Sequence, residues 1–216
     1  MKNLVLALLI TVTASLKGQT FVSYTSVSGG GTIDSNLNKR DAVQGSTFLF
    51  KDWNNSARLF CTDQRIFDVE NINFDLKNDK FASMISKDSI FIFDNIFKVK
   101  INNRQFVSLK NKFYETIYSS NNNFVFLKEY LLKIEPELHK ITNTVIGPGK
   151  YNTENKYYIY KDGDIEKLTL NKKHILEIVN SKESLVIKYV KSNRLSFSSE
   201  EDIVKIFQFY DSQSNE

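Results

Sequence analysis

Two glutamates on either side of a proline are the first side chains in this sequence whose spacing suggests chemistry. In an extended chain, Glu135 and Glu137 point to the same side and lie about 7 Å apart, a separation compatible with a carboxylate pair that acts as acid and base. A hydrolase that uses scattered carboxylates such as these is therefore one hypothesis for function. The alternative is structural, because charges and a proline at the end of an apolar strand discourage pairing with another strand edge.

The two histidines and the single cysteine do not predict a further catalytic or metal site. His174 and Glu177 lie three residues apart and share a helix face, but a metal site needs more ligands, and neither an HExxH motif nor a partnered ExxH motif occurs; the other histidine is His139. Cys61, the only cysteine, alternates with apolar residues in ARLFCTD, which favours a buried core residue over a reactive thiol. We therefore predict no catalytic residue, no metal ligand and no cofactor.

Trp53, the only tryptophan, is the one candidate ligand-binding residue. It lies in the polar turn KDWNNS beside Asn54 and Asn55, where its ring could stack on a sugar or on a partner. The alternative, which we favour, is that the ring caps the end of a sheet core.

Short strands must position these residues. From Ser46 to about Ile134, runs of β-branched and aromatic residues are separated by two to four residues of Asn, Asp, Lys or Gln, which favour tight turns. This spacing predicts strands paired in sequence order, in a mainly β (α+β) fold: a curved antiparallel meander or a partly open barrel. The segments that begin at Ser89 (SIFIFD) and Asn123 (NFVFLKEYLLKI) are apolar on both faces and predict a covering layer. HKITNTVIGPGKYNTENK predicts a long surface loop.

The apolar period lengthens after Leu170, where two to three short helices are expected to close the fold. Asn171, Ser181 and Ser198 are the predicted N-caps. The apolar face of these helices needs a surface, and the strands near Phe91 and Phe124 are the candidates.

The chain opens with MKNLVLALLITVTASLKGQT, in which Lys2 precedes an apolar run. This pattern is typical of a secretory signal peptide and predicts an exported protein that is periplasmic, associated with the outer surface or secreted. No later segment is apolar over the roughly 20 residues of a membrane-spanning helix, so no membrane span is expected. The expected organisation is a signal peptide over residues 1–18, a flexible N-terminal segment over 19–45, a β-meander over 46–170 and packed C-terminal helices over 171–212.

The charge distribution argues against a nucleic-acid partner. The formal net charge of +4 falls to +2 when Lys2 and Lys17 are removed with the signal peptide (4 − 2). Lysines and acidic residues then alternate along the chain, whereas proteins that bind phosphates gather their basic residues on one face or arm.

Several segments carry a resemblance. GSTFLFKDWNN from Gly45, the regular meander, NKYYIY, KKHILEIV and the ending IKYVKSNRLSFSSEEDIVKIFQFYDS are similar to a family of small exported proteins of unknown function from Gram-negative bacteria. The resemblance covers nearly all of the chain after residue 18. It implies one integrated domain in an exported location, and it implies no activity.

These observations favour a non-enzymatic module of the cell envelope or secreted space that binds a partner protein, a glycan or an apolar ligand. The alternatives are the hydrolase above and a purely structural envelope component. If the protein is a binding module, we expect an apolar patch on the sheet that the helices do not cover. The candidate residues for that patch are Phe67, Phe81, Phe97, Phe106 and Tyr114.

Overall fold

Antiparallel strands make up most of the fold, followed by three short helices. The computed structural model describes residues 30–35, 43–121 and 124–213, so the expected signal peptide lies outside the described residues. The strands are β1 (Gly31–Asp34), β2 (Ser56–Cys61), β3 (Ile66–Glu70), β4 (Ile72–Asp75), β5 (Lys80–Ser86), β6 (Ser89–Phe93), β7 (Ile96–Ile101), β8 (Arg104–Leu109), β9 (Lys112–Ser119), β10 (Phe124–Leu138), β11 (Val145–Lys161) and β12 (Asp164–Leu168).

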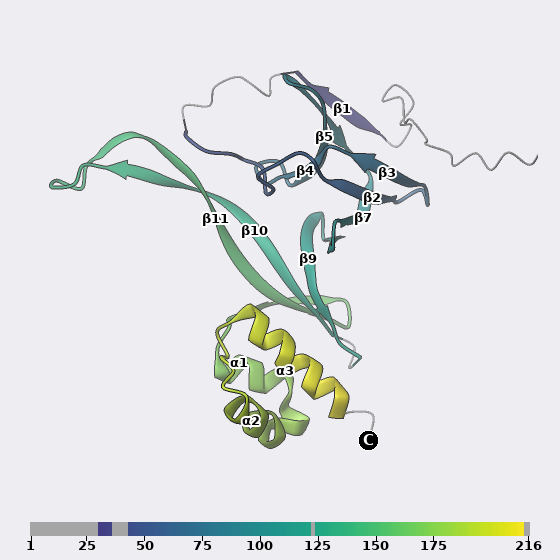
Figure 1. Ribbon diagram of the computed structural model, residues 1–216, viewed down its shortest axis with the longest axis vertical. Helices are drawn as coiled ribbons and strands as arrows, with labels where there is room; N and C mark the ends of the chain where they lie inside the picture. Colours follow the sequence, from purple (N-terminus) through teal and green to yellow (C-terminus); the bar gives the residue numbers. More distant parts are fainter. Residues whose placement is uncertain (1–29, 36–42, 122–123, 214–216) are drawn as a thin grey trace, which may run out of the picture.

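The strands form two antiparallel sheets (Figure 1). One has four strands in the order β1-β6-β5-β4, and the other has eight in the order β12-β11-β10-β9-β8-β7-β2-β3. The expected mainly β meander is confirmed, because most neighbours in each sheet are consecutive in sequence. The chain leaves the large sheet after β3 and returns to it as β7, so it builds two open sheets rather than one closed barrel.

Asparagine and aspartate make the turns, as their preference for left-handed backbone angles predicts. Asn71, Asn95 and Asn102 have φ values of 54°, 57° and 51°. In the hairpin between β11 and β12, Asp162 and Gly163 both have positive φ, which matches the turn expected from Asp-Gly-Asp.

The two sheets pack face to face around a core rich in phenylalanine. Phe74 and Phe81 stack with ring centroids 4.7 Å apart, and Phe106 lies 5.4 Å from Phe81. Cys61 is buried in this core, as its alternation predicts. Phe91 belongs to the same core, so the second layer over its strand is the large sheet; the expectation that helices would cover it was wrong.

The helices pack on the other end of the large sheet. They are α1 (Lys172–Ile178), α2 (Glu183–Ser192) and α3 (Glu200–Ser212), with a short 3-10 helix at Asn180–Lys182. Phe207 of α3 is fully buried, and its ring lies 5.0 Å from that of Phe124 and 5.7 Å from that of Phe126. The helices therefore share a second core with β10, as predicted for the strand that contains Phe124.

One of the three predicted N-caps is confirmed. Asn171 accepts a hydrogen bond from the backbone N–H of His174 (2.9 Å) at the start of α1. Ser181 lies in the 3-10 helix, and α2 begins without a side-chain cap. The cap of α3 is Ser199, one residue after the predicted Ser198.

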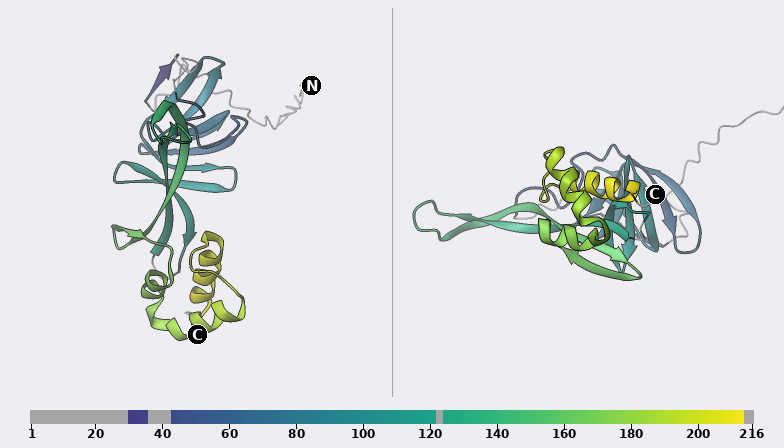
Figure 2. Two further views of the ribbon diagram at one scale, coloured as in Figure 1. Left: turned by 90° about the vertical axis from the view of Figure 1, so that its left-hand side faces the viewer. Right: turned by 90° about the horizontal axis from the view of Figure 1, so that it is seen from below.

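A long hairpin of β10 and β11 projects from the body of the molecule (Figures 1 and 2). The two strands pair from Phe124 with Lys161 out to Leu138 with Val145. The expected surface loop in HKITNTVIGPGKYNTENK was therefore wrong, since only six residues, 139–144, turn between the strands. Residues 31–34, expected to belong to a flexible segment, instead form β1 at the edge of the small sheet.

Candidate functional site

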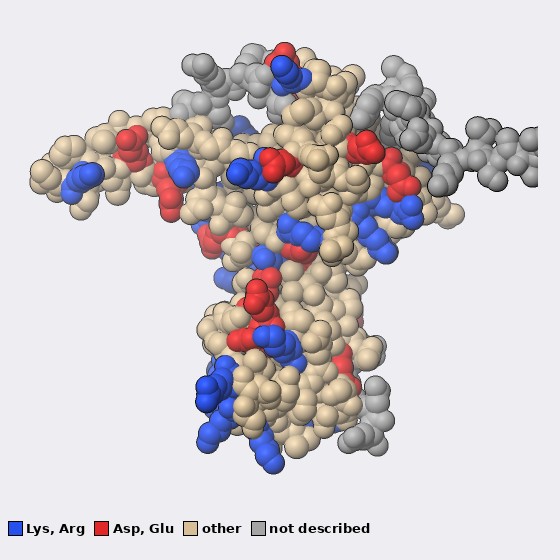
Figure 3. Space-filling model, in the orientation of Figure 1, with Lys and Arg blue, Asp and Glu red and all other residues tan. Residues whose placement is uncertain are grey.

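The outer half of the β10–β11 hairpin contains five of the nine exposed large aliphatic residues of the described chain. We call residues 133–152 the arm and residues 138–146 its tip. Large apolar side chains on the arm are between 45% and 85% exposed: Ile134, Leu138, Ile141, Val145 and Ile146. Figure 3 shows the arm standing clear of the rest of the molecule, with both basic and acidic side chains along it. Aliphatic residues grouped in this way lack the burial that normally stabilises a strand, and such exposed groups mark interaction surfaces.

Both strands of the arm have outer edges without a neighbouring strand. β10 pairs with β9 only over Val125–Lys128, and β11 pairs with β12 only over Tyr157–Lys161. In the described chain, one residue outside the hairpin pairs with the edge of the arm. The backbone N–H of Gln44 donates to the Gly149 carbonyl (3.0 Å), and the Gln44 carbonyl accepts from the Tyr151 N–H (2.8 Å).

Cross-strand polar contacts and a glycine shape the arm. Lys133 forms an ion pair with Glu154 across the strands (2.8 Å), and Asn152 donates to Glu135 (3.1 Å). Gly149 has a φ of 83°, and a Cβ atom there would lie 2.3 Å from the carbonyl oxygen of Glu135. Only glycine fits this position, where the register between β10 and β11 shifts. The Gly-Pro-Gly segment thus bends a strand rather than ending one.

Glu135 and Glu137, the predicted carboxylate pair, both lie exposed on this arm. Glu135 accepts the hydrogen bond from Asn152, and the Glu137 carboxylate lies over Gly147, so the two carboxylates do not converge in a pocket. The hydrolase hypothesis therefore receives no geometric support from this pair.

A buried charged cluster fixes the base of the arm on one face. Arg104 donates two hydrogen bonds to Glu115 (2.6 and 2.8 Å), and Glu115 also accepts from the hydroxyl of Tyr130 on β10. Burial opposes the charge of Arg104, but the interaction with Glu115 outweighs it and raises the pKa of Arg104. Burial raises the pKa of Tyr130 as well, and the neighbouring carboxylate raises it further. Each charge is satisfied by a fixed partner, as a positioning role requires.

A second cluster fixes the base on the opposite face. Glu129 is buried and accepts hydrogen bonds from Lys112 (2.8 Å) and from the hydroxyl of Tyr158 (2.6 Å). Burial raises the pKa of Glu129, but these two donors more than offset it, so the pKa lies below its ordinary value. The two clusters hold β10 from both sides, and the arm extends from this rigid base.

A group of apolar side chains also lies on the outer face of β2, β3 and β7. We call Phe60, Ile66, Phe97 and Lys98 the outer patch. Ile66 is 57% exposed and Phe97 45% exposed, the rings of Phe60 and Phe97 lie 6.4 Å apart, and Lys98 Nζ lies 4.8 Å from the centre of the Phe60 ring. Phe97 faces outward because a bulge falls where Phe60 and Cys61 pair with Lys98 and Ile96.

This outer patch contains only one of the five aromatic residues predicted for an uncovered surface. Phe81, Phe106 and Tyr114 are buried, and Phe67 packs against the sheet core. Phe97 is the one that remains exposed. Those predictions were wrong for four residues because alternation does not reveal which face a second sheet will cover.

Trp53, the candidate ligand-binding residue, lies in the loop before β2. It is half-buried, and its ring meets the ring of Phe48 edge-on with centroids 4.6 Å apart. Phe48 bridges to Asp75 at the edge of the small sheet. Among the contacts of the described residues, none joins Trp53 to the outer patch or to the exposed aliphatic residues of the arm.

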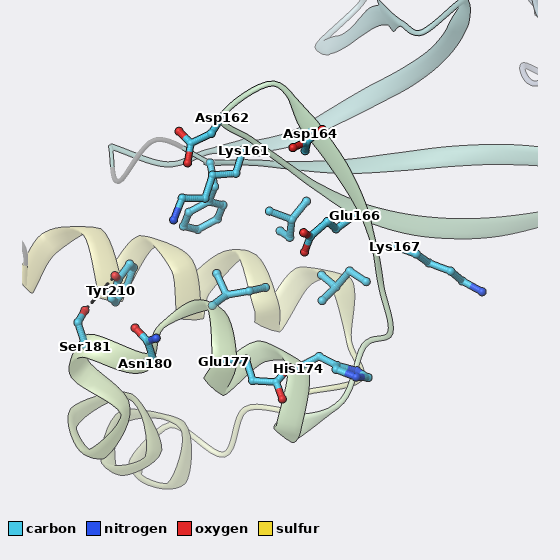
Figure 4. A pocket seen from close by; sticks show the side chains of 14 residues that line it. Lys161, Asp162, Asp164, Glu166, Lys167, His174, Glu177, Asn180, Ser181 and Tyr210 are labelled. Carbon is cyan, nitrogen blue, oxygen red and sulfur yellow. Dashed lines mark hydrogen bonds between the residues drawn. The ribbon is translucent and has the colours of Figure 1, made fainter.

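A surface pocket of about 660 Å³ lies between β12, α1 and α3 (Figure 4). Its apolar lining belongs to the helical core, including Phe124 and Tyr210, and Tyr210 contacts Ser181 through their hydroxyls (3.1 Å). Figure 4 shows Glu166 pointing into the pocket and Lys167 pointing away from it. Within the described chain, no three His, Cys, Asp or Glu side chains are grouped to hold a metal ion.

The histidine and glutamate singled out on α1 line this pocket. His174 Nδ1 contacts the Asn171 amide (3.0 Å), which ties its ring to the helix cap. Glu177 forms no hydrogen bond or ion pair with another described side chain. Among the described residues, this pair has no third side chain with which to hold a metal ion.

Sequence reasoning missed the arm, although a signal for it was present. Apolar residues flank the turn on both sides, at Leu138 before it and at Val145 and Ile146 after it. A pair of β-branched residues directly after a turn is typical of a returning strand.

No helix in the described residues has the length and hydrophobicity needed to cross a membrane. No family model, curated protein or solved structure matches the chain.

Proposed function

We propose that this protein is a non-enzymatic binding module that engages a partner protein through the aliphatic side chains of its arm. The observation that carries the proposal is the exposure of five aliphatic residues on one projecting hairpin, from Leu138 at 45% to Ile141 at 85%. Isolated exposed aliphatics are ordinary on protein surfaces, but five on a single extension are a concentration that docking explains.

The chemistry of the arm favours a protein over a glycan or a lipid bilayer. Sugars are bound by aromatic faces with polar groups around them, and the tip contains no Phe, Tyr or Trp. A bilayer interior excludes backbone edges that lack hydrogen-bond partners, and neither edge of the arm has a neighbouring strand in the described chain, apart from the contact of Gln44 with β11. A protein groove can accept aliphatic side chains while its own polar groups, or water, satisfy the edges.

The arm is suited to contact through its side chains rather than by adding to another sheet. Pro136 in β10 has no N–H to donate to an incoming strand. The bend at Gly149 further twists the β11 edge. These features protect the open edges against nonspecific strand pairing, while the aliphatic side chains stay available.

The location that goes with this function is outside the cytoplasm. The amino-terminal pattern of Lys2 followed by an apolar run supports export, and the resemblance to small exported proteins agrees with it. A purely structural envelope component is the other candidate, and it would use the same arm as a permanent joint.

Co-purification from the native cell tests the proposal. After brief chemical crosslinking, wild-type protein should carry a discrete partner, and the double variant Ile141→Asp, Val145→Asp should lose it. The matched control is Leu185→Asp, because Leu185 is an aliphatic residue on α2 with 48% exposure that lies outside the arm. If the arm variant keeps the same partner at the same yield, binding through the arm is wrong.

A further inference from the structure

We propose that the surface pocket between β12, α1 and α3 binds a small organic cation of the aliphatic amine class. This site is separate from the arm and goes beyond the proposed function. The observation that carries the proposal is a cavity of about 660 Å³ that combines buried apolar side chains with exposed acidic ones. Cavities of this size hold small-molecule ligands, and their few polar groups select the kind of ligand.

The floor of the pocket is formed by side chains of the helical core. Phe124, Leu168 and Tyr210 are between 4% and 8% exposed, and Ile159 and Ile178 also line the cavity. All five belong to the core that the helices share with β10, so the floor is fixed by packing. A ligand that covers this floor removes apolar surface from water, which favours a hydrocarbon body.

The charged side chains that line the pocket are mainly acidic. Four lining residues are acidic and two are lysines, which gives a formal charge of −2 (2 − 4, with His174 neutral), although the whole chain carries +4. Lys167 points away from the pocket, whereas Glu166 points into it (Figure 4). The pocket therefore attracts cations. Its acidic residues are Asp162, Asp164, Glu166 and Glu177.

Two of these carboxylates lie on different elements and can contact a ligand. Glu166 on β12 and Glu177 on α1 form no side-chain hydrogen bond or ion pair with another described residue, whereas Lys110 Nζ lies 3.9 Å from Asp164. A metal ion needs several ligands around one point, and no such group occurs among the described residues. Carboxylates spread over an apolar floor instead match an ammonium group on a hydrocarbon chain.

Nuclear magnetic resonance of the histidine rings tests this site, with 1,4-diaminobutane as the probe. Of the two histidines, His174 lines the pocket and His139 lies at the tip of the arm. At constant pH and ionic strength, the diamine should shift the His174 signals in a saturable manner and leave those of His139 unchanged. The neutral analogue 1,4-butanediol has the same chain length and should shift neither.

Variants identify the carboxylates that hold the amine. Glu166→Gln should weaken binding about fivefold, the upper range for loss of an exposed ion pair, and addition of Glu177→Gln should weaken it further. The matched control is Glu70→Gln, which removes the same charge from β3 and should bind like the wild type. Lys167→Gln should bind at least as tightly as the wild type. Melting curves establish that every variant is folded.

Three results would overturn the proposal: no saturable shift of His174, an equal shift with the neutral diol, or full affinity in the folded double variant. The arm variant Ile141→Asp, Val145→Asp should bind the diamine like the wild type, because its changes lie outside the pocket. Loss of the partner from the arm would leave amine binding intact, and an absence of amine binding would leave the partner in place, so the two proposals fail separately.

Discussion

Substitution of Ile141 should leave folding stability almost unchanged, although it removes a large aliphatic side chain. The side chain is 85% exposed, so about 15% of it is buried (100 − 85). Complete burial of an isoleucine contributes about 1.5–3 kcal/mol, which scales to roughly 0.2–0.5 kcal/mol here. Ile141→Ser is therefore expected to destabilise the fold by no more than about 0.5 kcal/mol.

Phe207→Ala is the contrasting change in the helical core. Its side chain is fully buried between Phe124, Phe126 and Tyr118, whose rings lie 5.0, 5.7 and 6.3 Å away. Removal of a buried phenylalanine costs about 3–5 kcal/mol. In a protein of this size, each kcal/mol lowers the melting temperature by about 2–4 °C. The two variants should thus differ by several degrees at least.

Urea unfolding followed by tryptophan fluorescence and circular dichroism measures both free energies. The reasoning fails if Ile141→Ser costs more than about 1 kcal/mol, because the tip would then be packed on the body and unavailable to a partner. It fails equally if Phe207→Ala is neutral, since the helices would then not share a core with β10.

Three further outcomes are expected. Cys61 should react slowly with a thiol reagent in the native state and quickly in denaturant, because burial both shields it and raises the pKa of its thiol; rapid labelling of folded protein would contradict its place in the core. The lowered pKa of Glu129 means that its contribution to stability is present above the unfolded pKa near 4.3 and is lost as the pH falls through the folded value. Acid unfolding curves should therefore be shallower for Glu129→Gln than for the wild type below about pH 4, and identical pH dependence would refute the role of the Lys112 and Tyr158 bonds. Deletion of residues 171–213 should abolish the cooperative melt by exposing Phe124, and an unchanged melting temperature would show that the helices are an independent unit.

Local chemistry explains what the sequence predicted well. Turns at Asn and Asp follow from a side chain that tolerates left-handed angles, as at Asn71 and Asn102. The cap at Asn171 is likewise a contact between residues three apart. The pairing of consecutive strands follows from short connections, and it accounts for most of the large sheet.

Features that depend on contacts between residues far apart in the sequence could not be predicted from the sequence. Strict alternation would place Phe97 on the same face as Val99, and Ile85 on the same face as Phe81, but bulges at both positions turn Phe97 and Ile85 to solvent. A bulge adds one residue, and its position depends on the partner strand rather than on the local pattern. The sequence also did not predict that the chain leaves the large sheet after β3 and returns to it as β7, which places that sheet over Phe91.

The candidate site was harder to predict than the fold. Trp53 drew attention because it is rare and lies in a polar turn, whereas the arm is built from common aliphatic residues whose exposure only the structure reveals. Gly149 was interpreted as a loop signal because a glycine at positive φ occurs in both loops and bulges. Apolar residues on both sides of a polar turn would have distinguished the two.

Crosslinking from single positions in the native cell tests the docking role of the arm most directly. A photoreactive amino acid is placed at Ile141 of the tip and, as a control, at Leu185 of α2, and the covalent products are weighed after illumination. A docking arm predicts one discrete protein adduct from position 141 and none from position 185, with twice the mass of the chain if the partner is a second copy. No adduct from position 141, or the same diffuse products from both positions, would contradict it.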